Sequence, residues 1–336
     1  MVRILAAFFF VLFLSSCVTE MATSMMEIKV ASIDEVAKSC EQGDMQACKD
    51  AARRYRYGSD APVDKDLAAK YYGLGCTGND RESCRQLYKM AGDMYRAKEL
   101  KRDDPKLLDM YRDSCSGDYG PGCAALGYNY HWGKGVKKDL GKALELYDKG
   151  CSHGSTWGCA HAGMFYEEGN HVTRDLAKAK SYYEKGCRGE EALACARIGL
   201  MYMQGNGVPQ NYDLAFTYLE KSCQGALDDR NNAGCFGLAR LYEQGLGCQQ
   251  DKEQAVKLYR LTCYGVEPKN AEGCVKLAKA YQSGEGIEPD ANAVHEYFRQ
   301  ACDLGSREGC VGRYTDECDR LKIPQACEWL KKEGLY

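Results

Sequence analysis

The sequence has no excess of basic residues and, beyond its first seventeen positions, no long hydrophobic run. Its 336 residues include 45 Lys and Arg against 48 Asp and Glu, which gives a formal net charge of −3. Proteins that bind nucleic acid carry a basic excess or a basic patch, so this balance argues against nucleic acid as a partner. No segment after residue 17 approaches the ~20 apolar residues of a membrane-spanning helix. We therefore expect a body that neither spans a membrane nor binds nucleic acid.

Signature motifs of several enzyme classes are also missing. The chain contains no HExxH, CxxC or Walker sequence, and none of the Ser-x-x-Lys, Ser-Asp-Asn and Lys-Thr-Gly motifs of serine β-lactamases. A Gly-x-Gly sequence recurs, but it follows a predicted helix rather than a strand, which disfavours a phosphate-binding loop. The sequence thus predicts no catalytic residue, no metal and no cofactor.

The first seventeen residues resemble the leader of a bacterial lipoprotein. Arg3 supplies a positive charge, residues 4–14 are almost wholly apolar but too short to span a bilayer, and the sequence LSSC ending at Cys17 resembles a lipobox. In that motif the cysteine is acylated and becomes the mature N-terminus. We expect a signal peptide over residues 1–16, a lipid on Cys17 and a flexible tether over residues 17–32. An ordinary signal peptide with a chance cysteine is the alternative.

Twenty cysteines are many for this length, and an exported chain can oxidise them. Once Cys17 is assigned to the lipid, one cysteine, Cys248, stays unpaired and the others fall into nine close pairs. The predicted disulfides join Cys40 to Cys48, Cys76 to Cys84, Cys115 to Cys123, Cys151 to Cys159, Cys187 to Cys195, Cys223 to Cys235, Cys263 to Cys274, Cys302 to Cys310, and Cys318 to Cys327.

One cysteine pair also suggests a metal site. Two histidines, His153 and His161, lie two residues beyond Cys151 and Cys159, and two Cys with two His can hold zinc. The same pair position recurs eight times without such histidines. We therefore expect a disulfide here, as at the other pairs, and no metal.

The cysteine spacing reveals an internal repeat. All but the last pair recur every 36 to 40 residues, and six segments of 29 residues run from the second cysteine of one pair to the first of the next. A seventh segment, from Cys84 to Cys115, has three extra residues and lacks the Gly-x-Gly. The six regular segments begin at Cys48, Cys123, Cys159, Cys195, Cys235 and Cys274.

Each regular segment predicts two helices. Counted from its first cysteine, a small residue at +4 and a tyrosine at +7 lie on one helical face, and a glycine at +10 ends the helix. An Asp or Asn at +16 can cap the second helix, which buries positions +20 and +24. Helices of this length are marginal alone, so each hairpin must stack on its neighbours. The fold prediction is therefore an all-α solenoid of about seven disulfide-stapled helix hairpins over residues 33–335, with capping helices at its ends.

These residues carry a family resemblance. The pattern of Leu-Gly-x-x-Tyr, Gly-x-Gly-Val, Asp-x-x-Lys-Ala and Tyr-Tyr-x-Lys-x-Cys resembles the Sel1-like repeat, a relative of the tetratricopeptide repeat. A cysteine pair in each repeat is similar to the Helicobacter cysteine-rich protein family. The resemblance covers nearly all of residues 33–335, and it implies an α/α superhelix with a concave binding surface. Some proteins of this cysteine-rich family are described as β-lactamase-like or penicillin-binding.

The predicted binding surface lies on the first helices, at positions +5 and +8. These two positions lie outside the buried face of the helix and share a face of their own. In the flanking segments, position +5 is basic: Arg53, Arg240 and Lys279. An apolar middle with basic ends would suit an extended peptide or an acidic protein segment. Packing against the neighbouring repeat is the other interpretation. The predicted partner-binding residues of the central segments are Tyr128, His131, Met164, Leu200 and Met203.

Two open questions remain at the level of single residues and of function. Cys248 stands at +13, where four other segments have Val or Ile, so it is either a buried apolar substitute or a reactive thiol. The expected function is a lipoprotein scaffold that binds a protein or peptide at the cell envelope or on a host. A penicillin-binding or β-lactamase-like cell-wall hydrolase is the alternative. Because Val18 rather than Asp follows Cys17, we expect the outer membrane, on either its periplasmic or its outer face.

Overall fold

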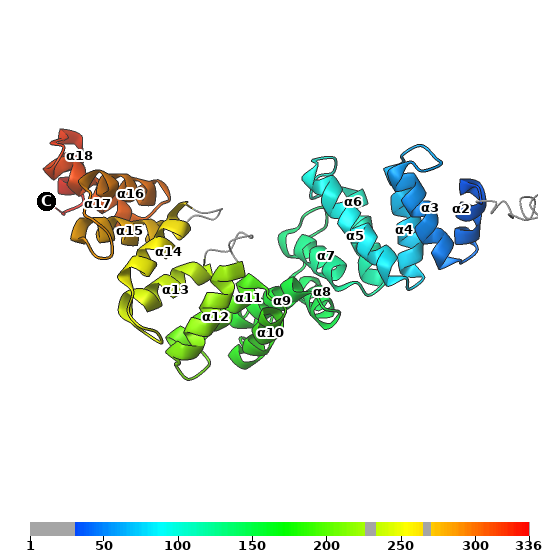
Figure 1. The fold of residues 1–336 in the computed structure, drawn as a ribbon, viewed down its shortest axis with the longest axis horizontal. Helices are drawn as coiled ribbons and strands as arrows, with labels where there is room; N and C mark the ends of the chain where they lie inside the picture. Colours follow the sequence, from blue (N-terminus) through cyan, green and yellow to red (C-terminus); the bar gives the residue numbers. More distant parts are fainter. Residues whose placement is uncertain (1–30, 226–232, 265–269, 336) are drawn as a thin grey trace, which may run out of the picture. The chain divides into compact units, whose positions relative to one another are not determined.

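The computed structural model describes residues 31–225, 233–264 and 270–335, and within these ranges every regular element is an α-helix (Figure 1). The signal peptide and Cys17 lie outside the described residues. No helix in the described ranges is long and apolar enough to cross a membrane. The helices are α2 (Ile33–Glu41), α3 (Met45–Tyr57), α4 (Lys65–Thr77), α5 (Arg81–Arg96), α6 (Pro105–Ser116), α7 (Gly120–Trp132), α8 (Leu140–Ser152), α9 (Thr156–Glu168), α10 (Leu176–Arg188), α11 (Ala192–Gln204), α12 (Tyr212–Gly225), α13 (Ala233–Gln244), α14 (Lys252–Tyr264), α15 (Ala271–Ser283), α16 (Ala291–Asp303), α17 (Arg307–Asp319) and α18 (Pro324–Lys332).

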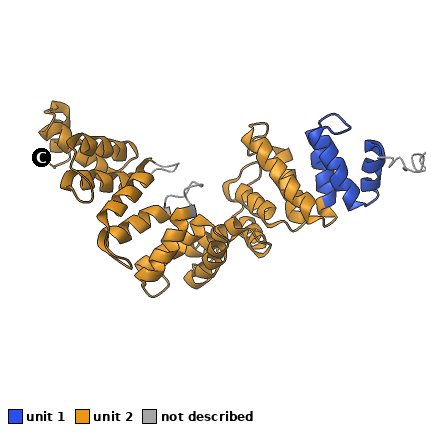
Figure 2. Ribbon diagram, viewed as in Figure 1, with its two compact units in different colours: residues 1–75 blue, residues 76–336 orange. Residues whose placement is uncertain are grey.

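The chain forms two compact units, residues 1–75 and residues 76–336 (Figure 2). The first unit contains α2, α3 and most of α4, and its helix α2 begins at a capping box between Ser32 and Glu35. The second unit contains the helices from α5 to α18, and consecutive helices pack on one another along its length. The all-helical solenoid that the sequence predicts is confirmed in these elements.

The first helix of a regular hairpin ends at a glycine in the left-handed conformation, as the +10 spacing predicts. The φ angle is 65° at Gly133, 74° at Gly169 and 71° at Gly205, values that strain other residues. The residue at +16 then caps the second helix. In α8, for example, the Asp139 carboxylate accepts a hydrogen bond of 2.9 Å from the backbone N–H of Lys142.

The second glycine of the Gly-x-Gly sequence is required by packing between repeats. A Cβ on Gly207 would lie 2.5 Å from the Cβ of Leu176, at the start of the preceding second helix. A Cβ on Gly135 would lie 2.7 Å from the backbone oxygen of Asp103, just before α6. This loop therefore packs against the preceding repeat, which agrees with the prediction that it is not a phosphate loop.

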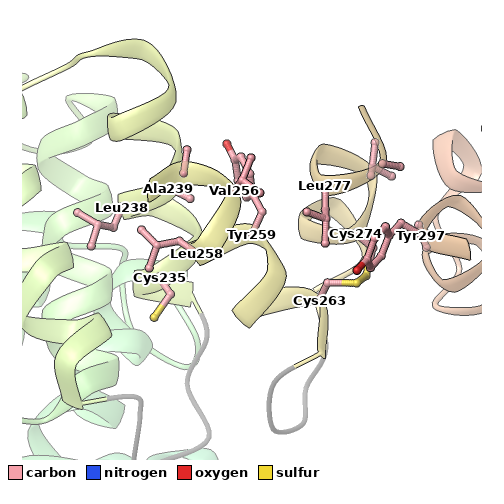
Figure 3. Packing of buried hydrophobic residues seen from close by; sticks show 14 of the residues in the cluster. Cys235, Leu238, Ala239, Val256, Leu258, Tyr259, Cys263, Cys274, Leu277 and Tyr297 are labelled. Atoms are coloured by element: carbon pink, nitrogen blue, oxygen red, sulfur yellow. A yellow bond between two sulfur atoms is a disulfide. The ribbon is translucent and has the colours of Figure 1, made fainter. Parts of the chain in front are cut away.

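Small residues at +4 bring the two helices of a hairpin together. A Cβ on Gly163 would lie 2.6 Å from the ring of Tyr183, which is completely buried. In the C-terminal hairpins this position is alanine, and Ala239 belongs to the same hydrophobic core as Tyr259 and Leu277 (Figure 3). The core therefore runs between the two helices of each hairpin and on to the next hairpin.

Nine disulfides join consecutive helices. All nine predicted pairs form, from Cys40–Cys48 between α2 and α3 to Cys318–Cys327 between α17 and α18. Figure 3 shows one of them, Cys263–Cys274, between α14 and α15. Each bridge closes a turn between hairpins or at a terminal helix, so the staples are local.

Candidate binding surface

The first helices of neighbouring hairpins pack directly on one another in the second unit. Contacts join α7 to α9, α9 to α11, α11 to α13, and α15 to α17, whereas the contact between α5 and α7 is as slight as that between the second helices α8 and α10. We call the surface formed by α5, α7, α9, α11, α13 and α15 the first-helix face. The five predicted partner-binding residues belong to it: Tyr128 and His131 on α7, Met164 on α9, and Leu200 and Met203 on α11.

A layer of three side chains recurs on this face, at +8 of one first helix, +24 of its second helix and +2 of the next first helix. In one such layer the hydroxyl of Tyr183 donates to the Glu167 carboxylate at 2.5 Å, and Arg197 approaches the same oxygen at 3.4 Å. Burial, and then the nearby carboxylate, raises the pKa of Tyr183. The tyrosine is therefore a permanent hydrogen-bond donor.

A second charged layer repeats this arrangement nearer the C-terminus. The Tyr259 hydroxyl donates to Glu243 at 3.1 Å, and the ammonium of Lys276 lies 2.9 Å from the same oxygen. Burial raises the pKa of Tyr259, with Glu243 as the next cause. The layer borders a surface pocket of about 350 Å³. The acidic and basic side chains of this layer are paired with each other, so a ligand in the pocket would meet a weaker electrostatic field.

The basic end predicted around Lys279 is neutralised in the same way. Lys279 forms an ion pair with Glu308 on α17, and Lys252 forms one with Glu285 at 3.1 Å. Pairs as exposed as these contribute little to stability, but they satisfy the lysines locally. The apolar-middle, basic-ends pattern therefore does not describe the C-terminal part of the first-helix face.

The corresponding layer between α7, α8 and α9 is aromatic. His131 lies with its Nδ1 3.4 Å from the Tyr147 hydroxyl oxygen, and the His161 ring stacks on Tyr147 with centroids 5.0 Å apart. The indole of Trp157 meets His161 edge-on at 4.3 Å. Within the described chain, the Nδ1 of His161 is buried without a hydrogen-bond partner. Burial, then the charges of His131 and Arg197, lowers the pKa of His161 to about 4.

Beside this layer lies a continuous set of side chains that we call the aromatic strip: Tyr95, Arg102, Tyr128, Trp132 and Trp157. The Arg102 guanidinium lies over Tyr95 at 4.2 Å and over Tyr128 at 5.0 Å. The Tyr128 ring is 6.2 Å from Trp132 and 5.8 Å from Trp157. The Trp132 side chain is 55% exposed. The repeat pattern predicted only Tyr128, because the tryptophans stand outside positions +5 and +8 and the other two residues come from the irregular second repeat.

The structure corrects one predicted partner-binding residue. Met203 is only 8% exposed and belongs to the same buried cluster as Leu219 and Leu241, so its surface is used between repeats. The other four predicted residues are half-buried and keep part of their surface accessible. Leu200 is one of them, although it also packs on the helix that carries Gly237. In this layer the other two positions hold Leu219 and Gly237 instead of aromatic residues, and Met203 packs into the hydrophobic cluster that contains Leu219.

Comparison with known proteins settles the family. The Sel1 repeat profile matches seven segments that together cover most of the chain: residues 46–80, 71–95, 120–155, 158–190, 192–226, 232–265 and 271–306. The chain belongs to the Sel1 repeat family. Among proteins with curated functions, none is significantly similar to it.

Two solved structures share the fold of this Sel1-repeat chain. One is a protective antigen of uropathogenic Escherichia coli with an SLR fold, at a TM-score of 0.68 and 21% identity, and the alignment covers 91% of this chain and 64% of that one. The other is a Sel1 repeat protein from Oxalobacter formigenes, at a TM-score of 0.61 and 22% identity, with coverage of 73% and 95%. The chain therefore spans less than two thirds of the E. coli protein, and the likeness concerns the fold.

One turn between Sel1 repeats places a serine, a histidine and an aspartate together, a cluster that was not predicted from the sequence. Residues 150–154 match Gly-x-Ser-x-Gly, and His153 lies with its Nδ1 3.1 Å from the Ser152 hydroxyl and its Nε2 3.7 Å from Asp118. However, the same Nδ1 is 2.9 Å from the backbone oxygen of Lys149, to which Ser152 also donates at 2.8 Å. A histidine that donates through Nδ1 cannot take the serine proton there. These side chains cap the end of α8, and the hydrolase alternative gains no activated serine from them.

Two further cysteine questions have structural answers. Cys151 and Cys159 are bonded to each other, so their sulfurs are not thiolate ligands and the zinc alternative loses half its donors. Cys248 forms no disulfide, is half-buried and packs against the hydrophobic core that includes Tyr259. Burial, and then Asp251, raises the pKa of its thiol, which lowers the fraction of reactive thiolate.

Proposed function

We propose that this Sel1-repeat chain is a protein-binding scaffold, tethered by a lipid at Cys17 to a bacterial membrane, with the first-helix face as its binding surface. Repeat solenoids bind partners along extended surfaces made by corresponding positions of successive repeats. The observation that carries the proposal is the run of half-buried aromatic and apolar side chains, from Tyr128 through Met164 to Leu200, on helices that contact one another. Surfaces of this kind are where interface energy concentrates.

The cell-envelope location rests on two features of the sequence. The short positive and apolar leader ending at Cys17 supports lipidation, and a membrane anchor of two or more acyl chains is durable. Nine disulfides suit an oxidising compartment rather than the cytosol. Val18 after the acylated cysteine favours the outer membrane. The partner is then a component of the envelope or a protein that meets the cell surface.

Charge substitutions on the first-helix face test this function. We expect Met164→Glu with Leu200→Glu to abolish capture of partner proteins by the purified chain from solubilised envelopes, because two buried carboxylates would have to be desolvated at the interface. The matched control is Leu214→Glu on second helix α12, where a leucine of 39% exposure lies off this face. Capture would be read by quantitative mass spectrometry. Equal capture by all three proteins would contradict the proposed surface, provided that circular dichroism shows each is folded.

A further inference from the structure

The aromatic strip contains two of the chain's three tryptophans. Trp132 lies at the end of α7 and Trp157 in the first turn of α9, and both rings flank Tyr128. An indole that is 55% exposed leaves apolar area in water, and the packing of the repeats does not use that area. An exposed tryptophan next to a half-buried tyrosine is typical of binding sites, because each supplies a large apolar surface at a low entropic cost.

The cation in this strip is held but not neutralised. The Arg102 guanidinium is sandwiched between the rings of Tyr95 and Tyr128, and it makes no ion pair with any of the described residues. Stacking occupies the faces of the guanidinium and leaves its edge of N–H donors available for a carboxylate. The strip thus combines aromatic faces with one positive charge at its α5–α6 end.

The chemistry of the strip indicates what it binds. Trp132 is exposed, and Tyr128 and Trp157 are half-buried beside it, so the surface offers apolar ring area next to one guanidinium. A polyproline II segment matches such a surface, because its proline rings pack between aromatic side chains and its unpaired backbone carbonyls accept hydrogen bonds. Such a segment is already extended, so it loses little entropy on binding. The near-balanced charge of the chain disfavours nucleic-acid bases as the stacked groups.

We propose that the aromatic strip binds an extended proline-rich segment of another protein, and that an acidic residue of this segment pairs with Arg102. This inference rests on the proposed scaffold function and specifies the partner's chemistry. Trp132, Tyr128 and Trp157 receive the proline rings, and Arg102 sets the direction in which the segment lies. The half-buried His161 meets the Trp157 indole edge-on, with ring centroids 4.3 Å apart, and thereby supports it.

The test uses three synthetic peptides and the purified full chain. The first peptide is proline-rich with one glutamate, the second replaces every proline by alanine, and the third replaces the glutamate by glutamine. Binding is measured by calorimetry and by tryptophan fluorescence. We expect the first peptide to bind about tenfold more tightly than the second, and Trp132→Ala to lose about tenfold in affinity for it. Trp132 is exposed enough for this variant to keep its fold, which circular dichroism checks.

A double-mutant cycle tests the acidic contact. Arg102→Gln should lower the affinity for the glutamate peptide about fivefold and leave the affinity for the glutamine peptide unchanged. Only the glutamate peptide carries a charge that can pair with Arg102. Two variants serve as controls and should bind as the wild type does. Tyr57→Ala removes an aromatic side chain that is 64% exposed but lies outside the strip. Lys142→Gln removes a cation that lies 4.6 Å from the Tyr130 ring, also outside the strip.

Several outcomes would overturn the inference. Equal binding of the proline and alanine peptides would do so, as would unchanged binding by Trp132→Ala, or binding of a chito-oligosaccharide that Trp132→Ala abolishes while the peptides do not bind. Partner capture that depends on Met164 and Leu200 but ignores Trp132 and Arg102 would reject the proline-rich partner and retain the scaffold function. If substitution of Met164 and Leu200 did not affect capture while the proline-rich peptide still bound, the inference would stand and only the wider surface would be rejected.

Discussion

At the scale of single residues, the same three positions of the repeat hold quite different chemistry. One layer is Glu167, Tyr183 and Arg197, in which a carboxylate is satisfied by a hydroxyl and a guanidinium. The corresponding layer one repeat earlier contains Tyr147 between two histidines, and its buried Nδ1 of His161 has no partner in the described chain. Because burial without a partner penalises a charge, His161 makes this layer sensitive to acid.

Acidification should destabilise the chain through His161. Its pKa in the folded state is lowered to about 4, so between about pH 6.5 and pH 4 the unfolded chain binds a proton that the folded chain does not. The free energy of unfolding therefore decreases as the pH falls through this window, by at most about 3 kcal/mol. Guanidinium unfolding at pH 7 and pH 4.5 would measure the fall, and His161→Gln should reduce it. The same pH dependence in both proteins would contradict this role of His161.

At the scale of helices, the glycines show which close approaches the packing needs. Gly163 in α9 faces the completely buried ring of Tyr183. A Cβ on Gly92 in α5, by contrast, would have only the flexible end of Arg96 nearby, at 3.8 Å. Both glycines lie inside helices, where alanine is intrinsically preferred to glycine by about 1 kcal/mol. The two sites therefore separate helix propensity from packing.

Alanine at these two positions should act in opposite directions. Gly163→Ala should destabilise the chain by about 1–2 kcal/mol, because the Tyr183 ring must move away from a Cβ at 2.6 Å. Gly92→Ala should stabilise it by up to about 1 kcal/mol, since nothing rigid opposes the new methyl group. Thermal unfolding followed by circular dichroism measures both changes. A stabilising Gly163→Ala would mean that α9 and α10 are free to separate.

At the scale of the whole molecule, stability is local and repeated. Each hairpin packs mainly on its neighbours, and each disulfide links helices that are adjacent in the chain. A bridge over so short a loop contributes toward the lower part of the roughly 2–4 kcal/mol that is usual for disulfides. With nine such bridges, from the one between α2 and α3 to the one between α17 and α18, the fold depends on oxidation along the whole series of described helices.

Non-reducing peptide mass spectrometry on protein purified from its native membrane tests this organisation. We expect nine local bridges, a free thiol at Cys248 and an acylated Cys17 at the mature N-terminus. Slow alkylation of Cys248 in the folded chain should accompany this result, because burial raises the pKa of its thiol. Reduced cysteines with an intact N-terminal leader would contradict the lipoprotein proposal and point to an intracellular protein.

The repeat, the helices and the disulfide pairs of this protein could all be predicted from local signals in the sequence. Spacing of 0, +4 and +7 marks a buried helical face, Gly133 and Asp139 end and begin helices through their own backbone preferences, and cysteines eight apart can meet across one turn. Each of these signals acts within one hairpin or between neighbouring ones. They could therefore be read from residues close together in the chain.

Which side chains remain on the surface depends on how neighbouring repeats pack, and this could not be predicted from the sequence. Met203 and His131 occupy the same repeat position, yet Met203 is buried and His131 is half-buried, because different side chains surround them. The aromatic strip likewise depends on Tyr95 and Arg102, from a repeat that departs from the pattern, meeting Tyr128 in the next. Helical periodicity predicts which way a residue faces, but the neighbouring repeat determines whether that face is covered.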